Sequence, residues 1–177
     1  MTFRAPSAES WRWRLAAGGG TFVGAPWETF VVKKRTGEPW IPAPAYGALL
    51  PQFSVNLVVH DIETALAFYR AVLEAEVHYA DADFAALRIL GVELMLHADH
   101  TYEHNPWSAA LGAGETRGLG AELRLLGMNP EAAAERARAA NALFQDVSLR
   151  GHGWREVMIR DPDGYVWAVG EAQNTAG

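Results

Sequence analysis

The chain has no cysteine among its 177 residues. Disulfides, thiolate zinc sites and cysteine nucleophiles are therefore excluded, and a reducing, cytoplasmic location is expected. No apolar run is long enough to cross a bilayer, so we expect no membrane partner. The apolar stretch at residues 15–25 is too rich in glycine for a signal peptide, which favours the same location.

Basic clusters are also missing. The formal net charge is -6, and no block of Lys or Arg stands out, which argues against nucleic acid as a partner. Neither a P-loop nor a Gly-x-Ser-x-Gly elbow occurs, so the sequence supports neither phosphate-loop nor serine-hydrolase chemistry. Half of the residues are hydrophobic, which is enough for one sizeable core.

The clearest local signal is a hairpin at residues 153–171. Two runs of apolar, aromatic and β-branched residues flank the tetrapeptide Asp161-Pro162-Asp163-Gly164. Pro162 pre-sets its φ, Asp161 can bond to nearby backbone, and Gly164 tolerates positive φ. The pattern predicts two antiparallel strands joined by a tight turn.

A strand, a helix and three strands are predicted before residue 100. Phe53, Val55, Leu57 and Val59 alternate with more polar residues, which is typical of a strand with one face on a core. Asp61 is a good N-cap for an amphipathic helix of about 13 residues. Short apolar runs then predict strands at 77–80, 84–90 and 92–97.

The same order of elements returns in the second half. Residues 98–117 are interpreted as a long connection, and a strand is expected at 122–125. Asn129 and Pro130 suit the start of an alanine-rich helix over 131–144, with Phe144 on its apolar face. A strand near 147–150 and the hairpin complete a second strand–helix–three-strand unit, so the chain contains an internal repeat.

These features carry a family resemblance. The stretch NLVVHDIETALAFYRAVLEAEV at 56–77, taken with the DPDG hairpin, resembles the glyoxalase/bleomycin-resistance/extradiol-dioxygenase (vicinal oxygen chelate) superfamily over residues 52–171. The resemblance implies an α+β fold in which two βαβββ modules, about 51–100 and 117–172, form a curved mixed sheet around a cavity. It also implies a homodimer. One departure is Glu74, where the family usually has glycine after the helix.

Residues 1–50 lie before the resemblance. They hold four of the seven tryptophans and are predicted to form an additional N-terminal arm, which either packs on the 51–172 domain or forms a lid or dimer clasp over its cavity. A strand at 27–34, a turn at 36–39 and extended chain at 42–45 are expected within the arm.

Metal-dependent members of the superfamily hold one divalent ion with four side chains from the first and last strands of each module. The corresponding positions here are Ser54, Glu93, Glu122 and Ala168. Two carboxylates remain and two ligands are lost, so no metal cofactor is favoured. If a divalent ion binds, Glu93 and Glu122 are its ligands, and Asn56 or His97 could substitute for a missing donor.

Two functions are consistent with this pattern. The favoured one is a metal-free module that binds a small planar or aromatic molecule. The alternative is a metal-dependent lyase, isomerase or dioxygenase. Glu93 and Glu122 are the candidate acid–base pair if they lie together, although Glu122 could instead pair with Arg124. The predicted ligand-binding residues are Ser54, Asn56, Met95, His97, Arg124, Trp154 and Trp167. The histidines at 97, 100 and 104 also fit a polar surface loop.

Overall fold

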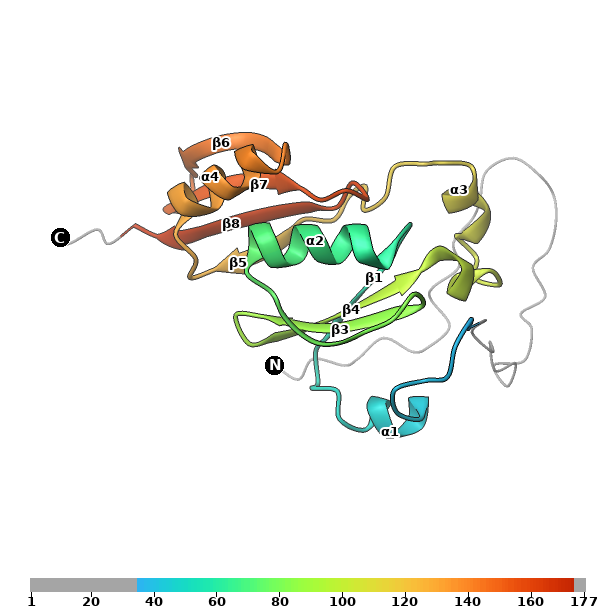
Figure 1. Cartoon of the computed structure of the whole chain (residues 1–177). Coiled ribbons are helices and arrows are strands. Elements are labelled where there is room, and N and C mark those ends of the chain that lie inside the picture. Colours follow the sequence, from blue (N-terminus) through green and yellow to red (C-terminus); the bar gives the residue numbers. More distant parts are fainter. Residues whose placement is uncertain (1–34, 174–177) are drawn as a thin grey trace, which may run out of the picture. The chain divides into compact units, whose positions relative to one another are not determined.

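A computed structural model describes residues 35–173 of the chain (Figure 1). These residues belong to one compact unit. The strand expected at 27–34 and the tryptophans at 11, 13 and 27 lie outside the described residues. No helix in the described part of the chain is both long and apolar enough to pass through a bilayer.

The two predicted modules are present, and each forms its own four-stranded mixed sheet. In the first sheet the strand order is β1-β4-β3-β2, and in the second it is β5-β8-β7-β6. Each sheet has one parallel pair, β1 with β4 and β5 with β8, and is otherwise antiparallel. The first module consists of β1 (Val55–Val59), α2 (Ile62–Leu73), β2 (Glu76–Ala80), β3 (Phe84–Ile89) and β4 (Val92–Ala98). The second consists of β5 (Leu123–Leu126), α4 (Pro130–Ala139), β6 (Leu143–Leu149), β7 (Trp154–Arg160) and β8 (Val166–Ala172).

Three short helices lie outside the modules. They are α1 (Ala43–Gly47) before the first module, and η1 (Asp99–Tyr102) and α3 (Ser108–Gly112) between the two. The expectation of extended chain at 42–45 is wrong, because Pro42 accepts from the backbone N–H groups of Ala45 and Tyr46 and starts a helical turn. The long connection predicted at 98–117 contains both η1 and α3.

The caps predicted from the sequence are confirmed. Asp61 accepts from the Thr64 N–H at 2.7 Å, and Asn129 accepts from the Ala132 N–H at 2.9 Å. Glu74, which stands where the family usually has glycine, has a left-handed φ of 54°. The left-handed C-cap is thus retained without glycine, and the Glu74 carboxylate also contacts Arg136 of α4 at 3.2 Å.

One continuous core joins the modules. Helix α2 packs on β3 and β4 and also contacts α4 (Figure 1). Tyr69 of α2 is fully buried, and its ring meets that of Trp167 in β8 edge to face at 5.8 Å. Both sheets therefore turn their apolar faces toward the same interior.

Two residues that the sequence assigns to apolar faces are not buried. Phe53 precedes β1 and is 72 % exposed, so its predicted contact with the helix is wrong. Phe144 belongs to β6, because α4 ends at Ala139 and Asn141 turns the chain with a φ of 55°. Its ring packs instead against the guanidinium of Arg160, at 3.9 Å from the ring centroid.

Candidate functional site on the open faces of the two sheets

Each sheet has a second face, turned away from the common core, which we call its open face. The predicted phase of the strands is confirmed, because Leu57, Leu94 and Leu96 are buried in the core and the residues between them point the other way. On the first sheet the open face includes Asn56, Val58, Glu76, Tyr79, Phe84, Ala86, Arg88, Glu93, Met95 and His97. On the second it comprises Arg124, Leu126, Trp154, Glu156, Met158, Arg160, Val166, Ala168 and Gly170.

A continuous row of rings covers the first open face. Phe84 contacts His97 at 4.8 Å between centroids, and His97 meets Tyr102 of η1 at 5.2 Å. Tyr102 in turn stacks on Trp107. At the other end, Tyr46 of α1 meets Phe84 edge to face at 5.4 Å. The row is therefore built from the sheet and from segments on both sides of it.

A β-bulge adds Tyr79 to this row. Val77 pairs with Leu87 on the core face, yet two residues later Tyr79 pairs with Ala86 on the open face. In a regular strand, Val77 and Tyr79 would lie on the same face of the sheet. The bulge inserts one extra residue between them, so Tyr79 lies on the open face instead. The ring of Trp40 stacks on that of Tyr79, with 5.0 Å between the ring centroids and an angle of 6° between the ring planes.

A polar network lies beside the aromatic row. His97 donates from Nδ1 to the Asn56 side-chain oxygen at 2.6 Å, and Asn56 donates to the Tyr102 hydroxyl at 2.5 Å. His97 is only 8 % exposed. His97 is thus a buried residue of β4 rather than part of a polar surface loop, whereas His100 is partly exposed in η1.

Glu93, the first surviving carboxylate, is held by two donors. The Tyr46 hydroxyl donates to Oε1 at 3.2 Å, and an Arg88 nitrogen lies 3.4 Å from Oε2. Burial, followed by the charge of Glu93 and this hydrogen bond, raises the pKa of Tyr46 to about 12. The phenol therefore stays protonated and donates to Glu93 at physiological pH.

Glu122, the second carboxylate, lies just before β5 and forms the predicted ion pair. Arg124 contacts its carboxylate at 2.6 Å and also contacts the buried Glu156. His152 lies close to both Arg124 and Glu156. The charge of Glu122 is thus balanced within the second sheet, and the structure does not bring Glu122 and Glu93 together as an acid–base pair.

The other predicted site residues are divided between the two sheets. Met95 is on the first open face and Trp154 on the second, while Ser54 stands just before β1. Trp167 is on the core face, 4 % exposed against Tyr69, and cannot line a cavity on the open face.

The residues at the four metal-ligand positions do not fit a divalent ion. Ala168 offers no donor, and Ser54, just before β1, offers only a hydroxyl, which leaves Glu93 and Glu122 as the two carboxylates of the set. Within residues 35–173, no group of three or more His, Asp or Glu side chains is placed to hold a metal. A divalent ion needs several oxygen donors at once, and the two carboxylates are already bonded to Tyr46 and Arg124 of this chain.

Part of the predicted N-terminal arm, residues 35–50, lies at the site, although the sequence named none of its residues as ligand-binding. Trp40 and Tyr46 of this segment, together with Glu93 and Arg88, line a cavity of about 430 Å³ on the first open face. The abundance of aromatic residues before residue 50 was the available signal. Only the fold shows which of them lie on the sheet.

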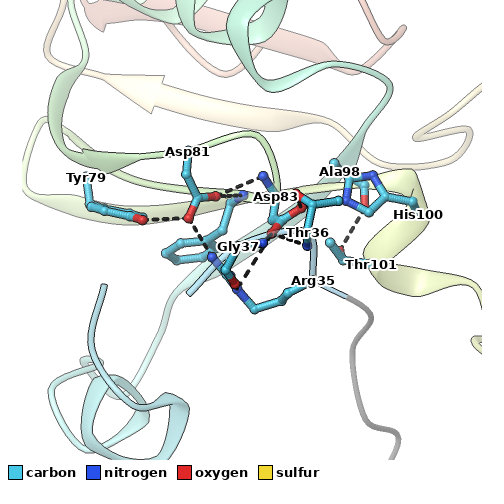
Figure 2. Close-up of polar contacts among 10 residues, drawn as sticks. Arg35, Thr36, Gly37, Tyr79, Asp81, Asp83, Ala98, His100 and Thr101 are labelled. Carbon is cyan, nitrogen blue, oxygen red and sulfur yellow. Dashed lines mark hydrogen bonds and ion pairs between the residues drawn. The ribbon is translucent and has the colours of Figure 1, made fainter. Parts of the chain in front are cut away.

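Figure 2 shows how this segment is attached at the β2–β3 turn. The carboxylate of Asp83, 1 % exposed, accepts from the Thr36 N–H and hydroxyl, both at 2.7 Å, and from the Gly37 N–H at 3.2 Å. His100 Nε2 lies 2.7 Å from the same carboxylate. Asp81 accepts from Arg35 at 2.5 Å. We call this cluster the Asp83 latch.

The Asp83 latch should weaken in acid. Burial alone would raise the pKa of Asp83, but hydrogen bonds from Thr36, His100 and Gly37 outweigh it and lower the pKa from 3.8 to about 2. The ionised carboxylate therefore stabilises the latched state above pH 3.8, and this contribution is lost as the pH falls through about 2. Carboxyl-detected NMR titration should give a pKa near 2 for Asp83. A pKa near 3.8 would contradict the latch. In the Thr36→Ala variant, which loses one hydrogen bond to Asp83, the pKa of Asp83 should be higher than in the wild type.

A match to a family model identifies the family of this chain. The family model of the Glyoxalase/Bleomycin resistance protein/Dioxygenase superfamily matches residues 52–169. The chain belongs to this superfamily. The match begins after the segment at 35–50, which is therefore an addition to the family's two modules. No curated protein sequence matches the chain.

Solved structures agree with the fold. A glyoxalase/bleomycin resistance protein/dioxygenase from Nocardioides has 21% identity and a TM-score of 0.56, over 75% of this chain and 93% of that chain. Hypothetical protein SA1046 from S. aureus has 18% identity and a TM-score of 0.54, over 72% and 98%. Fosfomycin resistance protein FosX from Listeria monocytogenes, solved with Mn(II) and sulfate, has 15% identity and a TM-score of 0.52, over 70% and 91%. At these identities the likeness extends to the fold alone.

Proposed function

We propose that this member of the superfamily is a metal-free protein that binds a small planar or aromatic molecule on the open face of the first sheet. The observation that carries the proposal is the row of rings from Trp40 to Trp107 across that face. Aromatic walls supply large contact areas and favour offset stacking with a planar ligand. Glu93, Asn56 and His97 are the polar groups that would orient it.

The chemistry of the donors supports binding without a metal. Glu93 is bonded to a phenol and approached by a guanidinium, and Glu122 is paired with Arg124. A divalent ion would have to displace these partners and would then gain only two carboxylates, since position 168 is alanine. The remaining polar groups can still orient a ligand through hydrogen bonds.

We further propose a homodimer. The open faces of both sheets are turned away from the core that joins them. A second copy could bring the second open face of one chain, with Arg124 and Trp154, opposite the first open face of the other. Sedimentation equilibrium should then give twice the 19.3 kDa chain mass. A monomer at all concentrations would contradict the dimer but not the binding of a ligand to the first sheet.

Metal analysis separates this function from the metal-dependent alternative. Protein purified without a metal-affinity tag should contain far less than one equivalent of Ni, Zn, Fe or Mn per chain by elemental analysis. Chelation should leave its melting temperature unchanged. About one equivalent of metal, lost together with stability on chelation and restored by one added ion, would overturn the proposal in favour of a metal-dependent lyase, isomerase or dioxygenase.

A further inference from the structure

The segment at 35–50 is attached to the first module in a way that suggests a movable cover. At its start, the backbone N–H groups of Thr36 and Gly37 are bound by Asp83 (Figure 2). At its end, residues 51–53 are exposed, and Phe53 makes no packed contact with the core cluster. The segment is thus hydrogen-bonded to the β2–β3 turn at its start and joined to β1 at its end by an exposed connection.

Between these ends, few contacts hold the segment on the sheet. Trp40 stacks on Tyr79, Tyr46 packs on Phe84, and the Tyr46 hydroxyl donates to Glu93. None of the five residues of α1 is buried. A segment with few buried contacts opens at a low free-energy cost compared with the strands below it.

Glu93 is the least exposed of the charged groups that line the space under the segment. Trp40, Leu49 and Leu50 form apolar walls of the 430 Å³ cavity, and the side chain of Glu93 is 12% exposed. Arg88, the other strongly charged residue of the lining, is 50% exposed and 3.4 Å away, so water screens its charge. A cationic ligand group inside the cavity would lie beside Glu93, and water would screen its charge less than that of Arg88. It would also face the rings of Trp40 and Tyr46.

We propose that residues 35–50 form a lid, closed by the Asp83 latch, over a site for a small planar aromatic cation such as an amidine or amine. The lid provides one wall of the site, and Glu93 pairs with the positive group. This inference rests on the proposed function, since it names the ligand class of the same open face and the residues that select it. Tyr46 covers Glu93 when the site is empty and moves aside for the cation.

The ligand class can be tested with three probes of one shape. Benzamidine is a cation, benzamide is neutral and benzoate is an anion, so their affinities isolate the effect of charge. Calorimetric or NMR titration should show benzamidine binding at least about tenfold more tightly than the other two, which corresponds to about 1.4 kcal/mol. Glu93→Gln should remove this preference, while Asp146→Asn on the surface of the second module should leave it unchanged.

The outcomes separate the two proposals. If benzamide or benzoate binds as tightly as benzamidine, or if Glu93→Gln has no effect, the cation site is wrong and the aromatic-binding function stands. If none of the three probes binds, nor any member of a set of larger planar aromatics, both proposals are wrong. Trp40→Ala should weaken benzamidine binding, because it removes one wall of the site, and unchanged binding would place the ligand elsewhere.

The lid can be tested separately by hydrogen–deuterium exchange. Asp83→Asn should speed exchange of the amides at 38–50 by about tenfold, while β3 and β4 keep their protection. Asp146→Asn is the matched control, because Asp146 pairs with Arg138 on the surface of the second module. Thr36→Ala is the second variant in case Asp83→Asn does not fold. Equal exchange in wild type and both latch variants would contradict the lid, as would benzamidine that fails to slow exchange at 38–50.

Discussion

Replacing Gly170 with alanine should lower the free energy of unfolding by roughly 2–4 kcal/mol. Gly170 lies in β8 and pairs with Glu156 of β7. A Cβ at this position would lie 2.1 Å from the Arg155 carbonyl oxygen and 2.8 Å from Glu156 Cγ. Because the closest atom belongs to the backbone of a paired strand, the sheet itself must shift to accept a methyl group. Urea denaturation followed by circular dichroism measures the loss.

Gly151 provides the matched control. It stands in the turn between β6 and β7, and a Cβ there would meet no atom within 4 Å. Its φ also lies outside the left-handed region, so alanine adds no backbone strain. Gly151→Ala should therefore change stability by no more than about 0.5 kcal/mol. A similar loss in both variants would show that the close approach at Gly170 does not determine the effect.

Arg117→Ala should be comparably destabilising, by roughly 2–4 kcal/mol. Arg117 is 3% exposed and donates to both oxygens of Asp99 at 2.7 Å, and to the Val58 carbonyl at 2.9 Å. It also lies 3.6 Å from Asp163 of the DPDG turn. Removing the guanidinium leaves these acceptors short of a donor at the junction of the two modules. Thermal or urea unfolding would report the change.

Arg138→Ala is the control, because it removes an arginine from an exposed ion pair instead of a buried one. Arg138 contacts Asp146 at 2.6 Å, but the two side chains are 48% and 66% exposed. An exposed pair of this kind contributes at most about 1 kcal/mol, and its contribution falls further in salt. If Arg117→Ala costs no more than Arg138→Ala, the buried network around Arg117 does not stabilise the junction of the modules.

The DPDG turn has some contacts that local sequence predicts and others that it does not. The turn itself follows from its residues, and Asp161 accepts from the backbone N–H groups of Asp163 and Tyr165 as expected. Its longer-range contacts were not predictable. Asp161 also accepts from the Tyr69 hydroxyl of α2 at 2.6 Å, and Asp163 accepts from the His60 N–H at 2.7 Å. The motif therefore joins the second module to the first, across sequence separations that no local pattern encodes.

The candidate site likewise contains residues that local sequence placed correctly and residues that it did not. Strand phase in the sequence correctly placed Asn56, Met95 and His97 on the open face of β1 and β4. The prediction of Trp167 as a ligand-binding residue is wrong, and it disagreed with the phase of its own strand, because alternation puts Trp167 on the face opposite Ala168, where it packs against Tyr69. Strand phase missed Tyr79, because a β-bulge has no signature in the alternation of apolar residues.

The sequence by itself determined the two repeated modules, the helix caps and the turn. These features depend on residue type and on periods of two or 3.6 residues, which are local properties. Only the tertiary structure decided that Tyr46 donates to Glu93 and that Arg124 contacts the buried Glu156 as well as Glu122. It also decided that Asp83 binds a segment 46 to 47 residues away in the chain. Such contacts form because burial and hydrogen bonding select one arrangement of the whole chain, and that selection is invisible in any single stretch of it.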